Sequence, residues 1–201
     1  FMLFYDLPVL YHHPASLFKI YQGGMSFHGG LIGVMLALWI YSKRHKIAYL
    51  TLTDLLAPIV PIGLALGRLG NFINGELFGR ISHVPWAMVF PNGGPYPRHP
   101  SMLYECFLEG VVLFVFLWLY TLKPRARGMA SGIFLIGYSI FRFLVEFVRQ
   151  PDPQLGFVAF GWVTRGQELC IPMFIIGIFL IVIAKRRGIL IQRKAKQPTP
   201  S

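Results

Sequence analysis

Long apolar blocks separated by short polar segments are the feature that most limits how this chain of 201 residues can fold. An α-helix needs about 20 predominantly apolar residues to cross the hydrocarbon core of a bilayer, and several blocks are close to this length. Only 13% of the residues are charged, whereas an ordinary soluble domain has about 25%. The pattern predicts an all-α fold: a polytopic transmembrane helix bundle with a small extramembrane cap.

Prolines, glycines and charges divide the apolar blocks. We expect a transmembrane helical domain over residues 1–187, with helices at about 26–42, 53–71, 101–122, 131–149 and 167–184. Residues 72–100 alternate glycine, proline and short apolar pieces, which indicates the cap, with a short hairpin. Residues 188–201 are expected to form a basic tail. Pro58 and Pro61 should kink the second helix, which a packed bundle tolerates.

The net charge of +11 is typical of nucleic-acid-binding proteins, but the positions of the basic residues argue against such a partner. Of the 19 Lys and Arg residues, 12 directly follow apolar blocks, within residues 43–46, 123–127 and 185–196. This is the positive-inside pattern of membrane proteins. We therefore interpret these segments as cytoplasmic anchors and expect no nucleic-acid partner. The C-terminus is then cytoplasmic, and the cap lies on the opposite side.

Polar residues concentrate in residues 67–80, directly after an apolar run. Arg68, Asn71, Asn74 and Glu76 occur within nine residues, and such groups at the edge of a hydrocarbon slab need partners or a purpose. Two amides and a carboxylate near an arginine can form a pocket for an anionic, hydroxyl-bearing head group. We favour anion binding for Arg68, because a guanidinium matches phosphate oxygens. The alternative is a structural ion pair with Glu76.

A second polar group lies on the predicted helix 131–149. Tyr138, Arg142, Glu146 and Arg149 follow helical spacing and share one face of an otherwise apolar helix. Such a face is costly against lipid, so it should face the bundle interior or a wet cavity. Arg142 and Glu146 could form a buried ion pair. The alternative is that Arg142 is a second cationic contact for the same phosphate, with Tyr138 as an orienting hydroxyl.

Three smaller features complete the candidates. His28 precedes two glycines that leave open space around its ring, so we consider it a base or hydrogen-bond donor. At the start of the third predicted helix we favour structural roles, with Ser101 as N-cap and Glu105 near the positive end of the helix dipole. Glu109, one turn further, could pair with an arginine.

Several catalytic motifs are absent from the sequence. It contains no Walker loop, no HExxH and no GxSxG elbow, and no carboxylate cluster suits a divalent metal. We therefore expect no metal and no cofactor. An anion-binding pocket with a possible base, but no nucleophile of its own, suggests that the substrates supply the nucleophile.

At these residues the sequence resembles the bacterial phosphatidylglycerol–prolipoprotein diacylglyceryl transferase family. The resemblance covers nearly the whole chain, and the stretch 67–76 is its long and specific signature. The other matching pieces are Phe27 to Leu31, Arg98 to Ser101 with Tyr104 and Glu105, and Gly137 to Asp152 in part. Family members have seven membrane helices, so the first helix and most of the second are expected to be missing from this chain.

The resemblance implies an activity. The family transfers the diacylglyceryl group of phosphatidylglycerol to the lipobox cysteine thiol of a preprolipoprotein, which forms a thioether and releases glycerol phosphate. The implied partners are phosphatidylglycerol, the lipobox peptide and the lipid bilayer. The implied location is the bacterial cytoplasmic (inner) membrane, as a multi-pass protein with its cap and active site toward the periplasm and its C-terminus in the cytoplasm.

Under this resemblance, Arg68 and Arg142 would hold the phosphate. His28 would be the base, with His99 as the second candidate, and Glu76 would orient an arginine. The residues expected to contact phosphatidylglycerol are completed by Asn71, Asn74, Gly79, Tyr138 and Glu146, with Glu105 and Arg149 as secondary candidates. The alternatives are a transporter or flippase for an anionic lipid, for which we find no inverted repeat, and a structural membrane subunit, which leaves the polar face unexplained.

Overall fold

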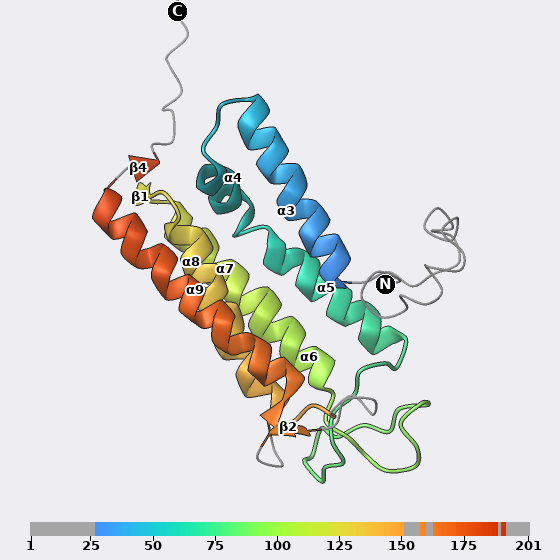
Figure 1. Ribbon diagram of the computed structural model, residues 1–201. Helices are drawn as coiled ribbons and strands as arrows, with labels where there is room; N and C mark the ends of the chain where they lie inside the picture. Colours follow the sequence, from blue (N-terminus) through green and yellow to red (C-terminus); the bar gives the residue numbers. More distant parts are fainter. Residues whose placement is uncertain (1–26, 151–156, 160–162, 189, 192–201) are drawn as a thin grey trace, which may run out of the picture. The chain divides into compact units, whose positions relative to one another are not determined.

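The computed structural model describes residues 27–150, 157–159, 163–188 and 190–191, and these form two compact units divided between Leu52 and Thr53. In this part of the chain three helical stretches are long and apolar enough to cross a membrane, or four if one bent pair counts as a single span. The predicted all-α membrane bundle is confirmed (Figure 1). Residues 1–26 and most of the expected basic tail at 188–201 lie outside the described residues.

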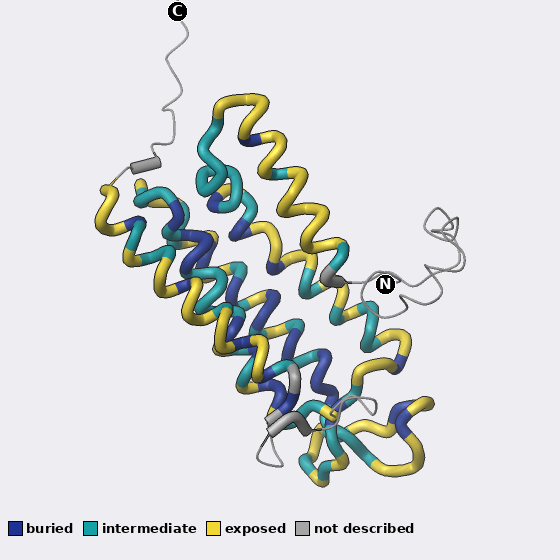
Figure 2. The backbone as a smooth tube through the Cα atoms, in the orientation of Figure 1, coloured by how far each residue is buried: buried dark blue, intermediate teal, exposed yellow. Residues whose placement is uncertain are grey.

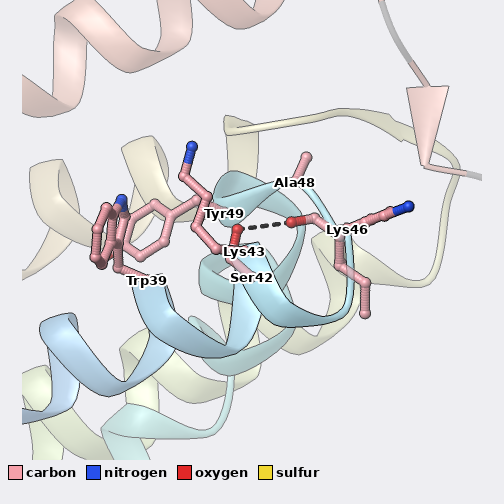
Figure 3. Close-up of a pocket in the computed structure, with 7 residues that line it drawn as sticks. Trp39, Ser42, Lys43, Lys46, Ala48 and Tyr49 are labelled. Atoms are coloured by element: carbon pink, nitrogen blue, oxygen red, sulfur yellow. Dashed lines mark hydrogen bonds between the residues drawn. The ribbon is translucent and has the colours of Figure 1, made fainter.

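The first unit contains α3 (Phe27–Arg44) and the beginning of α4 (Tyr49–Leu56). Ser42 donates a hydrogen bond of 2.7 Å to the carbonyl of Ile47 and so closes the turn between the two helices. An open hollow of about 570 Å³ lies at this turn (Figure 3), and Lys43 Nζ lies 6.0 Å from the centre of the Trp39 ring beside it. A basic helix end with an aromatic neighbour is typical of a membrane interface.

The predicted helix 53–71 is divided in the structure. It consists of α4 and α5 (Val60–Ile73), which are bent by 46° at the break between them. Pro58 lies in the break, and Pro61 lies in the first turn of α5, where its missing N–H is tolerated. The expected kink is therefore confirmed.

The next membrane stretch is continuous but irregular. It runs through α6 (Ser101–Glu105), the π-helical segment η3 (Cys106–Val112) and α7 (Leu113–Thr121). π-helical turns inside α-helices are frequently found at functional sites. A Cβ added to Gly110 in η3 would lie 2.5 Å from Ala65 Cβ of α5, so this glycine permits the close approach of the two segments.

Two longer helices complete the bundle: the first packs beside this stretch, and the second packs on the first. They are α8 (Met129–Glu146) and α9 (Arg165–Arg187), and a Cβ built on Gly132 or Gly177 would lie 2.9 Å from the carbonyl oxygen of the other glycine. Small residues at a crossing are what lets membrane helices approach. The outward side of α9 exposes apolar residues suited to lipid contact (Figure 2): Ile171, Ile175, Ile178, Phe179 and Val182.

Asp54 fixes the beginning of α8. Its carboxylate is fully buried and accepts hydrogen bonds from the backbone N–H groups of Gly128, at 2.6 Å, and Ser131, at 2.8 Å. The Ser131 hydroxyl adds a third bond of 2.7 Å. A carboxylate at these positions satisfies N–H groups that have no partner within the helix.

Short strands occur only in two small pairs of the described chain. β1 (Arg125–Ala126) pairs antiparallel with β4 (Leu190–Ile191), and β2 (Phe157–Ala159) pairs antiparallel with β3 (Val163–Thr164). The cap adds isolated bridges, in which Arg98 pairs with both Ile81 and Met88. The cap is also joined to the end of α8, because Arg80 N donates to Val148 O at 2.9 Å.

Candidate active site

Three helices bring two arginines to one buried carboxylate. Arg68 of α5 forms an ion pair through Nε with Oε2 of Glu105 on α6. Arg142 of α8 contacts the other oxygen of that carboxylate, with 2.5 Å between Nη1 and Oε1. The Glu105 side chain is only 1% exposed. A buried carboxylate with a guanidinium on each oxygen is well compensated, and it fixes the distance between the two cations.

Glu146 extends this network on the other side of Arg142. Its Oε2 lies 2.8 Å from Arg142 Nη2, one helical turn earlier on α8. Its Oε1 accepts a hydrogen bond of 2.8 Å from the hydroxyl of Thr164, the residue that caps α9. The buried Arg142–Glu146 pair considered from the sequence is thus present, and it forms part of a larger network.

Glu109 is buried one helical turn after Glu105 in the sequence. Within the part of the chain that the structure describes, neither of its carboxyl oxygens has a hydrogen-bond or ion-pair partner. The expectation that it pairs with an arginine is therefore wrong for the described residues. Glu109 lies in the first turn of η3, and it is buried in the bundle together with Glu105.

The two arginines differ in how open they are. The Arg142 guanidinium lies between two carboxylates, and its side chain is 11% exposed. The Arg68 side chain is 19% exposed, and among the described residues only Glu105 forms an ion pair or hydrogen bond with it. A guanidinium has five N–H donors. Arg68 therefore retains donors for an external anion, whereas Arg142 is enclosed.

Glu76 does not pair with Arg68 in the structure. Its side chain is exposed, and its backbone N–H donates to Asn71 O at 2.9 Å. Asn71 is half-buried at the end of α5, and Asn74 follows as the exposed C-cap. The alternative of an Arg68–Glu76 pair is thus replaced by the pair with Glu105.

The remaining candidates lie in the middle of α8, just beyond its end and in the cap. Tyr138 is half-buried and stacks on Phe134, with 6.0 Å between ring centres. Arg149 lies beyond the end of α8, and its carbonyl accepts a bond of 3.0 Å from Arg80 Nε. Gly79 is buried, and a Cβ there would lie 2.6 Å from Val148 O.

The two candidate histidines differ in what the structure describes. His99 Nδ1 lies 3.1 Å from the hydroxyl of Tyr104, which also accepts a bond of 2.6 Å from Trp86 Nε1. His28 lies in the first turn of α3, but its side chain is outside the described part. Its position relative to Arg68 is likewise not described, because the two residues belong to different units.

Ser101 has a different role from the one expected. It is the first residue of α6, whose N-cap is Pro100, and no side chain of the described residues caps this helix. The buried Ser101 hydroxyl instead donates 2.9 Å to the carbonyl of Leu77 and joins the cap to the helix start. Among the described residues, no group of three or more His, Cys, Asp or Glu side chains could hold a metal ion.

The sequence profile of the prolipoprotein diacylglyceryl transferase family matches residues 1–183. The chain belongs to this family. The phosphatidylglycerol–prolipoprotein diacylglyceryl transferase of Pseudomonas paraeruginosa is 60% identical over 187 residues, which cover 93% of this chain and 70% of that protein. The protein of the same name from Coxiella burnetii is 59% identical over 186 residues, or 92% of this chain and 71% of that protein. The chain is thus a transferase and a multi-pass membrane protein.

In this diacylglyceryl transferase, sequence reasoning identifies one member of the buried network only in part and misses another. The residues alone place Glu105 near the helix dipole and the resemblance makes it a secondary candidate, although Glu105 and Glu109 are four residues apart on an apolar helix and so share a face. Thr164 was not considered. The sequence Thr164-Arg165-Gly166-Gln167 before an apolar run is a capping-box pattern that could have marked the start of α9.

Proposed function

We propose that this chain joins the diacylglyceryl group of phosphatidylglycerol to the cysteine thiol of a prolipoprotein lipobox, at a site built around Arg68. In this reaction the bond between the diacylglyceryl carbon and a phosphate oxygen breaks, and a bond from that carbon to the cysteine sulfur forms. The thiol proton leaves, and glycerol phosphate is released. The names of the relatives support the two substrates.

The observation that carries the site is the difference between the two arginines. Negative charge develops on the leaving phosphate in the transition state, and fixed donors that face this charge stabilise it. Arg68 is oriented by Glu105 through one nitrogen and keeps other donors for the phosphate. We assign Arg68 to the direct phosphate contact.

Arg142 has a second role in this proposal. Its guanidinium is held by Glu105 on one side and Glu146 on the other, and it supplies positive charge close to the phosphate while fixing Glu105. Pre-organised donors need no reorientation during the reaction, which is where much of the rate enhancement originates. Because the Arg142 guanidinium is enclosed, this role is better supported than a direct bidentate contact with the substrate.

The other candidates are assigned by their positions and chemistry. A cysteine thiol has a pKa of about 8.5, so a base accelerates formation of the thiolate. His28 is the proposed base and His99 the second candidate. Polar contacts to the glycerol hydroxyls and the phosphate are proposed for Asn71, Asn74, Glu76, Tyr138 and Arg149, and Gly79 provides close backbone approach.

We propose that the Arg68 end of the bundle faces the periplasm in the bacterial inner membrane and that the C-terminus is cytoplasmic. The support is that α9 carries Lys185, Arg186 and Arg187 in its last turn, while its first turn lies at Glu146. Basic helix ends favour the cytoplasmic side. The network is therefore at the end of the membrane away from the basic residues.

The first experiment uses the purified protein, expressed as the complete gene product, in liposomes with phosphatidylglycerol and a lipobox peptide. Glycerol phosphate release is followed for the wild type, Arg68→Ala and the exposed Arg44→Ala as a matched control. We expect release to require the peptide cysteine, to fall by about 100-fold or more in Arg68→Ala, and to be unchanged in Arg44→Ala. Folded wild type that releases no glycerol phosphate would favour lipid transport instead.

The proton acceptor is tested with His28→Ala and His99→Ala across pH. If His28 is the base, the loss of activity in His28→Ala should be greatest near neutral pH. The loss should diminish at higher pH, where the thiolate forms without a base. His99→Ala should then keep the wild-type profile. The reverse result would assign the base to His99.

A further inference from the structure

The hydroxyl of Thr164 serves two different neighbours. As the N-cap of α9 its oxygen accepts a hydrogen bond from Gln167 N at 3.3 Å, and Gln167 Oε1 accepts one from Thr164 N at 3.1 Å. In this capping box the Thr164 hydroxyl acts only as an acceptor, through a lone pair of its oxygen. The hydroxyl proton is not needed for the cap.

That proton is donated to Glu146 Oε1, at a distance of 2.8 Å. Both residues are buried, with Thr164 3% and Glu146 5% exposed. Hydrogen bonds to an ionised acceptor in such surroundings are about twice as strong as neutral ones. Within the described part of the chain, each oxygen of Glu146 therefore has one partner, Thr164 on Oε1 and Arg142 on Oε2.

The first turn of α9 leaves little freedom to this carboxylate. A Cβ placed on Gly166 would lie 2.8 Å from the Cδ and Oε1 atoms of Glu146. The glycine thus admits the carboxylate to the positive end of the helix, where negative charge is favoured. Figure 1 shows that the beginning of α9 and the end of α8 lie at the same end of the bundle.

We propose that Thr164 is a positioning residue for the transfer reaction, because its hydroxyl holds Glu146 and through it sets the guanidinium of Arg142. The contacts continue from Arg142 to Glu105 and from Glu105 to Arg68, so the start of α9 is connected to the arginine assigned to the phosphate. The inference rests on the proposed function and deepens it. It adds the N-cap of α9 to the residues that determine turnover.

Three substitutions separate the hydrogen bond from the cap. Thr164→Ser keeps both the acceptor and the proton. Thr164→Asp keeps a good N-cap acceptor but loses the proton and places a like charge beside Glu146. Gln167→Ala weakens the capping box but leaves the Thr164 hydroxyl in place. All three are measured by kcat and KM for the peptide, together with the midpoint of thermal unfolding.

We expect Thr164→Ser to stay within about threefold of the wild-type kcat, and Thr164→Asp to lose about tenfold or more with little change in peptide KM. Gln167→Ala should unfold at lower temperature yet keep kcat within about threefold. Equal losses of kcat in Thr164→Asp and Gln167→Ala would overturn the proposal in favour of a purely structural cap. Wild-type kcat in Thr164→Asp would overturn it as well.

A second measurement does not depend on the reaction. The unfolding midpoints of the wild type, Thr164→Ala, Glu146→Gln and the double variant form a double-mutant cycle. Both variants that carry Thr164→Ala lose the N-cap, so this loss cancels when the coupling between the two residues is calculated. We expect the double variant to lose less than the sum of the single losses, and strict additivity would refute the coupling. If the wild type releases no glycerol phosphate, the proposed function fails while this cycle still reports on the Thr164–Glu146 contact.

Discussion

The Nη1 atom of Arg142 lies 2.5 Å from Oε1 of Glu105, and this contact joins α8 to α6 inside the apolar bundle. A buried ion pair contributes little net stability compared with apolar packing, but removal of one partner leaves an uncompensated charge. Glu105 is also the ion-pair partner of Arg68. Its carboxylate thus determines how far apart the two guanidinium groups lie.

Glu105→Gln should lower both stability and turnover. The amide cannot compensate two buried guanidinium groups, and loss of one partner of a buried pair typically costs about 3–5 kcal/mol. The measurements are the thermal unfolding midpoint in detergent and glycerol phosphate release per folded molecule. Glu76→Gln is the stability control, because Glu76 is exposed and surface changes are usually within about 0.5 kcal/mol. A wild-type midpoint in Glu105→Gln would contradict the bridging role.

Gly110→Ala should separate α5 from η3. The added Cβ would lie 2.5 Å from Ala65 Cβ, and overpacking of this kind costs about 1–3 kcal/mol. Because Arg68 is on α5 and Glu105 directly precedes η3, turnover should fall as well as stability.

A second substitution tests the cause of that loss. Ala65→Gly in the Gly110→Ala background removes the opposing methyl group and should recover most of both properties, whereas Ala65→Gly alone should change turnover little. The unfolding midpoint and the rate of product release are compared for the two single variants and the double variant. Failure of the double variant to recover would show that Gly110 acts otherwise than by permitting close approach.

The spacing rules predicted some of the network and not the rest for identifiable reasons. Arg142 and Glu146 are one turn apart on an apolar helix, so local geometry alone indicated that they meet. The partner of Arg68 could not be found this way, because Glu105 lies 37 residues further along the chain and reaches Arg68 only through packing of α6 on α5. Sequence proximity instead suggested Glu76, which the structure leaves exposed.

The fold was predictable where apolar blocks were long and bounded by charges. The kink between α4 and α5 followed from Pro58 and Pro61, whose rings cannot continue a regular helix. The π-helical segment η3 carries no proline or other local signal, and its close contact through Gly110 is with Ala65 of α5, far away in the sequence. Tertiary packing of this kind is not encoded in residue spacing.

Gly79→Ala should detach the cap from the end of α8. A Cβ at this position would lie 2.6 Å from Val148 O and 2.7 Å from His99 Cβ, both of which are fixed by backbone hydrogen bonds. We expect a loss of about 1–3 kcal/mol in stability and a larger loss in turnover, because Arg149 and His99 are displaced together. Thermal unfolding and product release measure the two effects.

The matched control is Gly63→Ala on α5, where an added Cβ meets nothing within 4 Å. Alanine has the higher helix propensity, so this variant should be neutral or more stable by up to about 1 kcal/mol. If Gly79→Ala behaves like Gly63→Ala in both measurements, close approach at Gly79 has no part in the site.

Asp54→Asn should affect stability without affecting the chemistry. Asparagine retains one carbonyl acceptor, so at least one of the bonds from Gly128 N, Ser131 N and the Ser131 hydroxyl is lost at the buried start of α8. A lost cap of this kind costs about 0.5–2 kcal/mol.

Asp54 lies at the opposite end of α8 from Arg142 and Glu146, so kcat per folded molecule should remain near the wild-type value. Unfolding midpoints and kcat per folded molecule test both parts. Ser139→Ala is the control, since among the described residues that buried hydroxyl donates only to Ile136 O of its own helix. A fall in kcat for Asp54→Asn at full folding would mean that the position of α8 along its axis, and not only the contacts at its far end, determines how Arg142 meets Glu105.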